Sequence, residues 1–205
     1  MKLEIKTMAK LKKDILRTFE TSTGSKPKRF ISSMLSAGVR TMIIVRFGQW
    51  IDNKNIVIKL FLMPIYFILN QRVKWKFGIQ IPKSAQIGEG FYIGHYGGIT
   101  IASDAVIGKN VNISQLVTIG ESGQGEKAGA PTIGDNVYIG AGAKIIGKIK
   151  VGNNAKIGAN AVIYKDIPDN AIVVSYPGYK IISYNGNYPV KTLKTMGSVA
   201  TLKPH

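Results

Sequence analysis

A six-residue repeat runs through the second half of the chain and limits its possible folds more than any other feature. From residue 81 an aliphatic side chain returns every six residues, in three separate runs. The thirteen positions are Ile81, Ile87, Ile93, Ile101, Ile107, Ile113, Ile119, Ile133, Ile139, Ile145, Val151, Ile157 and Ile163. The apolar face of an α-helix would return at intervals of three and four, so this period excludes one. Thirteen positions in phase also argue against chance spacing.

A period of six predicts a short strand followed by a turn, stacked coil upon coil into a solenoid. The aliphatic residues are expected to point inward and to form a column, so that each coil buries its core only against its neighbours. A glycine follows the aliphatic residue at positions 88, 94, 108, 120, 134, 140, 152 and 158. We expect these glycines to take up the sharp turn, where a Cβ atom would be strained.

The repeat is interrupted twice, and both interruptions predict surface features. Ile93 and Ile101 are eight residues apart, which leaves two extra residues in the stretch HYGG. Ile119 and Ile133 are fourteen apart, which leaves eight extra residues within GESGQGEKAGAPT. Insertions in a solenoid map to its surface and often to its binding face. The first one carries His95, the only histidine away from the C-terminal residue, and is expected to lift it into a groove.

The repeats resemble those of the hexapeptide-repeat acyltransferases, and most closely the serine acetyltransferase-like branch. The resemblance covers about residues 78–178 and rests on IGHYGGITI, QLVTIG, VYIGAGAKIIG and NNAKIGANAVI. It implies a left-handed parallel β-helix with three hexads per coil, a homotrimer, and acetyl-CoA as the acyl donor. We therefore expect an all-β fold, a left-handed parallel β-helix with an N-terminal α-helical segment. The expected domains are a helical segment over 1–78, the β-helix over 79–182 with a loop at 120–132, and a tail over 183–205.

His95 aligns with the catalytic histidine of the family, which implies that it acts as a general base. A neutral imidazole is suited to removing a hydroxyl proton, because its ordinary pKa lies near the working pH. The resemblance also implies a donor site for coenzyme A, made of Glu121, Ser122, Ala141, Lys156 and Ala159, with Lys165 and Lys180 as further phosphate contacts. No metal is expected, because a zinc carbonic anhydrase of this fold needs three histidine ligands and this chain has only one internal histidine. The chain also has no cysteine, which excludes a cysteine acyl-enzyme.

The acceptor site departs from the pattern of serine acetyltransferases at four positions. The family has two aspartates and an Arg-His pair where this chain has Gln80, Gly94, Gly129 and Ala130. An ammonium and a carboxylate are costly to bury unpaired, so these losses argue against L-serine. We therefore expect Gln80, Gly94 and Ala130 to bind a sugar hydroxyl of a bacterial capsule or O-antigen polysaccharide, as in relatives with the same losses. Serine or another small metabolite is the alternative acceptor, and a non-enzymatic β-helix is a third interpretation.

The acidic partner of His95 stays open at the level of the sequence. Glu89, Glu121 and Glu126 are the carboxylates nearest to it along the chain. None of the three has a spacing that singles it out.

The N-terminal segment carries most of the positive charge. Residues 1–80 contain 16 Lys and Arg against 4 Asp and Glu, without any recognisable nucleic-acid-binding module. Helices are expected over 8–20 and 31–51, followed by the apolar run IVIKLFLMPIYFILN over 56–70, which Pro64 makes too short to span a membrane. The helices are expected to cap one end of the β-helix and to lie against a membrane surface. The first 20 residues lack an apolar signal region, which predicts a cytoplasmic protein, peripheral on the inner face of the membrane.

Overall fold

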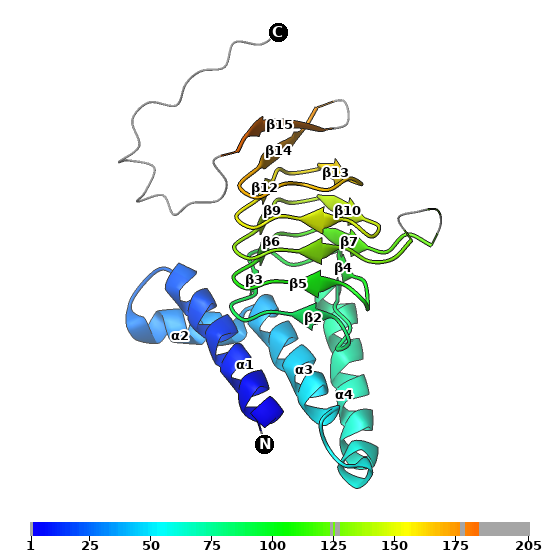
Figure 1. Ribbon diagram of the computed structural model, residues 1–205. Coiled ribbons are helices and arrows are strands. Elements are labelled where there is room, and N and C mark those ends of the chain that lie inside the picture. Colours follow the sequence, from blue (N-terminus) through cyan, green and yellow to red (C-terminus); the bar gives the residue numbers. More distant parts are fainter. Residues whose placement is uncertain (1, 124, 126–127, 177–178, 185–205) are drawn as a thin grey trace.

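The computed structural model joins an N-terminal helical part to a parallel β-helix (Figure 1). It describes residues 2–123, 125, 128–176 and 179–184. The helices are α1 (Lys2–Thr21), α2 (Lys26–Leu35), α3 (Ala37–Ile51) and α4 (Ile56–Phe77). They contain 20, 10, 15 and 22 residues, so the all-β label is wrong, whereas the expected combination of a β-helix with an N-terminal α-helical segment is confirmed.

Three sheets form the walls of the β-helix, and all but one of their strand pairs are parallel. Sheet A orders its strands β1-β4-β7-β10-β13, sheet B β11-β8-β5-β2, and sheet C β15-β14-β12-β9-β6-β3. The strands are β1 (Ile79–Gln80), β2 (Gln86–Ile87), β3 (Tyr92–Ile93), β4 (Ile99–Ile101), β5 (Val106–Ile107), β6 (Asn112–Ile113), β7 (Thr118–Gly120), β8 (Thr132–Ile133), β9 (Tyr138–Ile139), β10 (Lys144–Ile146), β11 (Lys150–Val151), β12 (Lys156–Ile157), β13 (Val162–Ile163), β14 (Ile172–Ser175) and β15 (Tyr179–Ser183). The chain visits A, B and C in turn, so one coil takes three hexads. The last pair, β14 with β15, is antiparallel.

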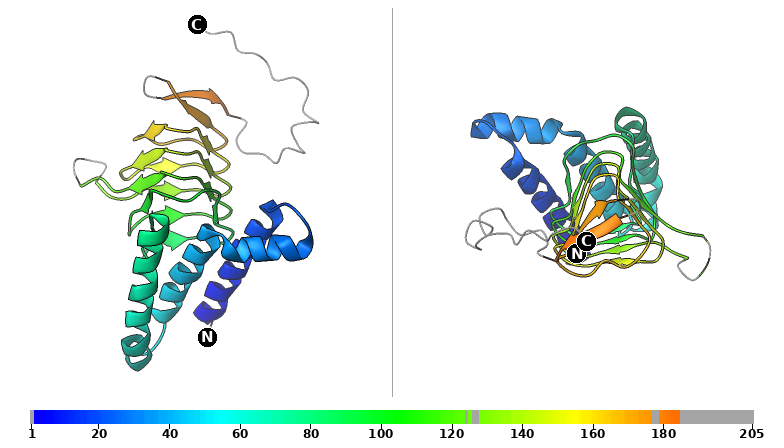
Figure 2. Two further views of the ribbon diagram at one scale, coloured as in Figure 1. Left: turned by 180° about the vertical axis from the view of Figure 1, so that it is seen from behind. Right: turned by 90° about the horizontal axis from the view of Figure 1, so that it is seen from above.

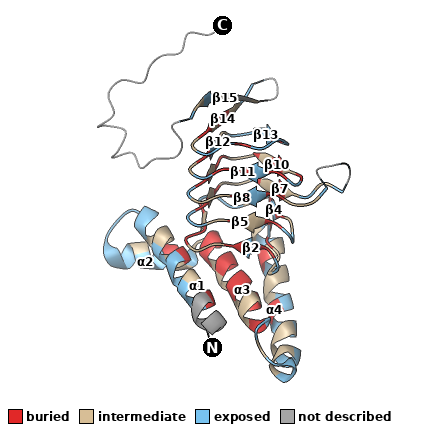
Figure 3. Cartoon of the chain, viewed as in Figure 1, coloured by how far each residue is buried: buried red, intermediate tan, exposed pale blue. Residues whose placement is uncertain are grey.

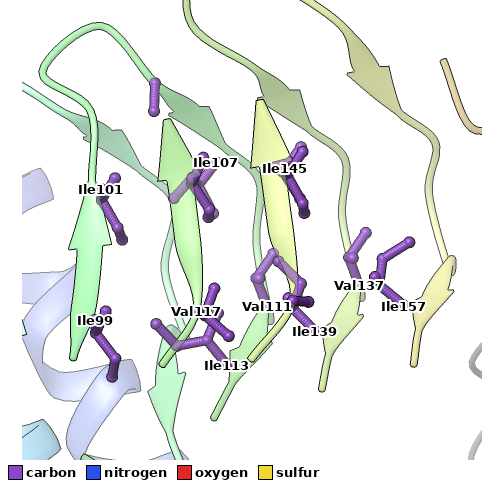
Figure 4. Packing of buried hydrophobic residues seen from close by; sticks show 14 of the residues in the cluster. Ile99, Ile101, Ile107, Val111, Ile113, Val117, Val137, Ile139, Ile145 and Ile157 are labelled. Atoms are coloured by element: carbon purple, nitrogen blue, oxygen red, sulfur yellow. The ribbon is translucent and has the colours of Figure 1, made fainter. Parts of the chain in front are cut away.

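The predicted aliphatic column forms the core of the coils. Each of its thirteen members is at most 6% exposed, and Figure 4 shows several of them stacked between neighbouring strands. The register explains this regularity, since Ile101 pairs with Ile119 and Ile119 with Ile145. Burying each aliphatic side chain contributes about 1.5–3 kcal/mol, so the column is the main source of stability in this part of the chain.

The glycines after the aliphatic residues serve a different purpose from the one expected. Their φ angles are not positive, so the backbone there would accept another residue. At most of these positions, however, the next coil leaves no room for a side chain. A Cβ atom on Gly88 would lie 2.4 Å from the carbonyl oxygen of Gly108, and one on Gly140 would lie 2.7 Å from the amide nitrogen of Ala159. Close stacking of the coils, rather than strain at the turn, requires glycine.

Left-handed backbone occurs instead two residues further on, at a line of asparagines. Asn110, Asn136, Asn154 and Asn170 have φ between 56° and 63°. Asparagine tolerates this conformation better than most residues. Their side-chain amides also form a ladder from coil to coil, with N···O distances of 3.2, 3.1 and 3.0 Å. The ladder ties one corner of four successive coils together.

The helices close the N-terminal end of the β-helix through a buried ion pair. Asp14 of α1 and Arg46 of α3 meet at 3.0 Å, and both side chains are 1% exposed. Arg46 also donates to the carbonyl oxygens of Ile87 at 2.9 Å and Gly88 at 2.6 Å. Asp14 accepts from the backbone N–H of Phe91 at 2.9 Å. Burial raises the pKa of Asp14, and the charge of Arg46 opposes that shift.

Two expectations about the helices need correction. The helix expected over 31–51 is broken at Ser36, which ends α2 and caps α3 by accepting from the backbone N–H of Val39. The run expected to be too short for a membrane span belongs to α4, a single helix that contains Pro64. An 18-residue window of α4 has a mean hydropathy of 1.5 and is 11% buried. By length and composition alone, α4 could therefore cross a membrane.

Candidate active site

His95 lies on the exposed turn that joins β3 to β4, at the corner between sheets C and A. Gly97 and Gly98 have φ of 108° and 62°, a conformation that glycine adopts without steric cost. The two extra residues therefore widen this turn, as the interrupted repeat predicted. The neighbouring Tyr96 packs edge-on against Phe77 of α4, with 5.6 Å between ring centroids. The end of α4 thus supports the turn that carries the histidine.

Turns from successive coils stack on this corner. The backbone N–H of Leu116 donates to Gly97 at 2.8 Å, that of Gly142 to Gln115 at 2.9 Å, and that of Asn160 to Ala141 at 2.8 Å. The turns after β3, β6, β9 and β12 therefore lie one above another. This arrangement places His95, Ala141 and Ala159 along one edge of the β-helix, with small residues in the coils beyond the histidine.

The long loop leaves the β-helix at a different corner, between sheets A and B. Glu121 and Ser122 follow β7, and Ser122 and Gly129 exchange two backbone hydrogen bonds of 3.0 and 2.8 Å. The loop is therefore a hairpin at its base, and Figure 1 shows it projecting from the wall. Ala130 is partly buried and packs against the core. Gln124, Glu126 and Lys127 lie outside the described residues.

The lysines expected to contact phosphate do not lie together in one chain. Lys156 lies on the outer face of sheet C, with its Nζ 5.6 Å from the Tyr138 ring centroid. Lys165 follows β13, on the side of the loop, with its Nζ 5.9 Å from the ring of Tyr164. The side chain of Lys180 lies outside the described part of the chain. Within one chain, the expected donor-site residues therefore fall on separate corners.

The residues expected to hold the acceptor do not all lie in the coil that carries His95. Gly94 directly precedes the histidine, and a Cβ atom there would lie 3.3 Å from the ring of Tyr92. Gln80 is exposed on β1, at the edge of sheet A, where it pairs with Thr100. Ala130 belongs to the other corner. One chain thus brings Gln80 and Gly94 to the first coil but not Ala130.

One of the three candidate acids is committed elsewhere. The carboxylate of Glu89 lies 2.7 Å from Lys13 Nζ and 3.9 Å from Lys109 Nζ, at the corner between sheets B and C. The hydrogen bond from Lys13 lowers the pKa of Glu89. Glu121 is exposed at the loop corner, and Glu126 is not described. Among the described residues, no cluster of three His, Cys, Asp or Glu side chains could hold a metal ion.

Gln115 and Asn112 are two polar residues beyond those predicted from the sequence. The side-chain oxygens of both are buried, and neither accepts a hydrogen bond within the described part of the chain. Gln115 lies on the His95 corner, one coil further along. Its presence in QLVTIG, one of the stretches that carries the family resemblance, was the available signal.

Comparison with known proteins relates part of the β-helix to a family of transferases. Residues 130–165 match the family described as bacterial transferase hexapeptide (six repeats). The repeat, the three parallel sheets and this match support a hexapeptide-repeat transferase, and they imply the left-handed coil expected from the resemblance.

Several of the relatives found are serine acetyltransferases. The one from Bacillus pumilus is 41% identical over 125 residues, which is 60% of this chain and 57% of the relative. A solved serine acetyltransferase from Brucella abortus strain S19, in complex with coenzyme A, is 29% identical with a TM-score of 0.73, over 87% of this chain and 68% of that one. The Neisseria gonorrhoeae enzyme in complex with serine is 29% identical with a TM-score of 0.69, over 85% and 68%. The chain spans about half the length of the curated relatives it matches.

These relatives overturn the expected polysaccharide acceptor. The reported relatives are serine acetyltransferases, and at 41–45% identity they favour the alternative acceptor, serine or another small metabolite. The error came from treating four altered side chains as decisive. A hydroxyl acceptor can also be held by backbone groups and by a neighbouring subunit, which a comparison of four positions does not include. The expectation of an acetyltransferase that uses acetyl-CoA agrees with these relatives.

Proposed function

We propose that the protein is an acetyl-CoA-dependent O-acetyltransferase that acts on the hydroxyl of a small metabolite, with L-serine as the first acceptor to test. The observation that carries the proposal is the position of His95. It lies on a widened, exposed turn at the corner where small turn residues of later coils stack above it. The serine acetyltransferase relatives support the reaction type.

The proposed reaction needs one group that moves a proton. The acceptor hydroxyl oxygen attacks the thioester carbonyl carbon while neutral His95 takes the hydroxyl proton. The C–S bond then breaks, and the proton passes from the imidazolium to the leaving thiolate of coenzyme A. Backbone N–H groups of the glycine-rich turns are candidates to stabilise the oxyanion between these steps. Direct transfer suits a chain without cysteine.

The donor is proposed to lie along the corner above His95. Ala141 and Ala159 are small, so the pantetheine arm of coenzyme A could rest against the coils there. Lys156 and Lys165 are exposed cations of the kind that pair with phosphate. Glu121, Ser122 and Lys180 complete the proposed set, as the resemblance implies.

A homotrimer is proposed because these residues occupy two corners of one chain. His95, Ala141 and Ala159 lie at the corner between sheets C and A, whereas Glu121, Ser122 and Lys165 lie toward sheet B. A groove between two neighbouring copies would bring the first corner of one chain to the second corner of the next. Three such sites follow from threefold symmetry.

The acceptor is proposed to be bound by fewer side-chain charges than in serine acetyltransferases. Gln80, Gly94 and Ala130 carry no formal charge. Lys148 provides one cation nearby, because its Cβ would lie 3.3 Å from a Cβ atom placed on Gly129 at the loop base. It is a candidate to pair with an acceptor carboxylate. We therefore expect activity with L-serine, but with a higher KM than a pocket with all four family side chains would give.

The test is a turnover assay that measures the free thiol of coenzyme A. The chain has no cysteine of its own, so a thiol reagent reports only the product. L-serine, L-homoserine and L-threonine are compared with glycerol, which has hydroxyls but no ammonium or carboxylate. Acceptor-dependent thiol release with one of the amino acids supports the proposal. Release that no small hydroxyl acceptor increases, from a protein that is folded by circular dichroism, would contradict it.

A further inference from the structure

The helix α4 leaves a row of apolar side chains in solvent, although it packs along α3. We call Ile56, Val57, Leu60, Phe61, Ile65 and Ile68 the α4 apolar face. Ile56 is 78% exposed, Leu60 72% and Phe61 70%. The six residues lie on neighbouring turns of one helix, so they form a continuous strip. Monomeric proteins seldom expose such a strip unless it contacts something.

A shallow trough between α3 and α4 adds positive charge to the same region. Its volume is about 360 Å³, and its floor includes Ile43, Leu69 and Val73. Arg40, Arg72 and Lys76 line the same trough, and none of its lining residues is acidic. An apolar floor bordered by cations matches a molecule that has acyl chains and an anionic headgroup.

The shape of the molecule presents this region to a flat surface. Figures 1 and 2 show α3 and α4 extending away from the first coil, with the free end of α4 farthest from the last coil. Figure 3 shows the exposed residues of α4 at that free end. Trp75, near the other end of α4, is 85% exposed between Lys74 and Lys76. Tryptophan beside lysine is typical of the level of lipid headgroups.

We propose that the α4 apolar face and the α3–α4 trough form a docking surface for a membrane rich in anionic phospholipid. The charge balance favours this occupant, because residues 1–80 carry 16 Lys and Arg against 4 Asp and Glu. A second copy of the chain, docked through the same surface, would bring identical cation clusters together across a two-fold axis. The proposal is independent of the acceptor that the β-helix uses.

The first test is co-sedimentation of the full chain with vesicles. Phosphatidylcholine vesicles are compared with vesicles that also contain phosphatidylglycerol, at low and high salt. We expect at least tenfold tighter binding to the anionic vesicles, weakened by salt because screening reduces the attraction. Equal binding to both vesicles, or no binding at low salt, would overturn the proposal.

Two pairs of variants locate the contact. Leu60→Gln with Phe61→Gln is expected to reduce vesicle binding by about tenfold or more, since apolar burial supplies much of it. Its control is Ile182→Gln, which is 48% exposed at the opposite end of the molecule. Arg72→Gln with Lys76→Gln is expected to remove the preference for anionic lipid. Its control, Lys26→Gln with Lys28→Gln on α2, removes the same charge elsewhere and should keep most of that preference.

Two measurements distinguish binding to a membrane from binding to a second copy of the chain. In a Trp50→Phe background, Trp75 is the only tryptophan, and its emission should shift to the blue with anionic vesicles alone. Sedimentation velocity without lipid should give the same particle for the wild type and for the Leu60 and Phe61 variant. A smaller particle for that variant, with unchanged vesicle binding, would show that another copy covers the α4 apolar face and would overturn the proposal.

Discussion

At the scale of single residues, the proposed chemistry depends on where the imidazole of His95 is held. His95 sits on a turn that Gly97 and Gly98 allow to widen, and Tyr96 packs that turn against Phe77 of α4. The side chain is exposed in the single chain. The proposed base needs this exposure to reach the hydroxyl of an acceptor. Few core contacts therefore depend on it, and its removal should change activity without changing the fold.

We predict that His95→Ala lowers kcat by about 10²–10⁴, because the hydroxyl would lose its general base. The measurement is thiol release from acetyl-CoA at saturating acceptor, beside Tyr96→Phe as a control on the same turn. Circular dichroism should give unchanged melting for both variants. Wild-type turnover in His95→Ala would mean that another group removes the proton.

A second residue-scale prediction concerns the buried pair Asp14 and Arg46. Arg46→Met should destabilise the chain by about 3–5 kcal/mol, because it leaves a buried carboxylate without its charge partner. Replacing both residues together, as Asp14→Leu with Arg46→Met, should restore part of that loss. Urea unfolding followed by circular dichroism measures the difference. Lys13→Gln, which removes an exposed ion pair with Glu89, should have little effect, and an equal loss there would contradict the assignment.

At the scale of elements, each coil is built from three short strands whose corners have different requirements. One corner needs glycine because the next coil leaves no room for a Cβ atom. Two residues later the backbone is left-handed and is occupied by the asparagine ladder. Both requirements occur together in three successive coils, at Gly108 and Asn110, Gly134 and Asn136, and Gly152 and Asn154.

The ladder can be tested with a matched pair at Asn154, whose φ is 57°. Asn154→Gly removes the amide ladder but keeps a residue that adopts this φ freely. Asn154→Ala removes the ladder and also forces a side chain into the left-handed region, which costs about 1–2 kcal/mol more. Thermal or urea unfolding should therefore rank the wild type above Asn154→Gly, and Asn154→Gly above Asn154→Ala. Equal stability of the two variants would show that backbone strain is unimportant there.

At the scale of the whole molecule, the coils stack into a rod and the helices lie at its N-terminal end. The N-terminal end is closed by α1, α3 and α4, which pack on the first coil, and the proposed active site begins in that coil at His95. The loop corner lies on a different edge of the rod. The site proposed above therefore combines residues of two neighbouring copies, which the proposed trimer would bring together.

Shared sites predict complementation between two inactive variants. His95→Ala is mixed equally with a variant in which residues 123–128 are replaced by two glycines, after unfolding and refolding together. If each site takes its histidine from one copy and its loop from the next, random trimers should regain about one quarter of the sites. Light scattering should give three chains per particle. Full activity of the loop variant by itself, or no recovery in a mixture shown to contain mixed trimers, would contradict shared sites.

Much of the β-helix followed from the sequence because its periodicity is local. The thirteen aliphatic positions are all buried, and both interruptions of the repeat, at His95 and at the loop, lie on the surface. The glycine pattern was recognised, but its cause was not, because the clash is with the coil that follows in space. The ladder of asparagines was also missed, since each one forms its hydrogen bonds 16 to 26 residues away.

The N-terminal part and the site depended more on tertiary structure. The break at Ser36 had a local signal, because a serine can cap the helix that follows it, whereas α4 continues through Pro64 although proline removes a hydrogen bond from a helix interior. The sequence by itself determined the coil and its core, and it singled out the residue that we propose as the base. Only the tertiary structure decided which corner each candidate occupies, because a corner is set by the number of residues in every coil before it and by the contact between coils.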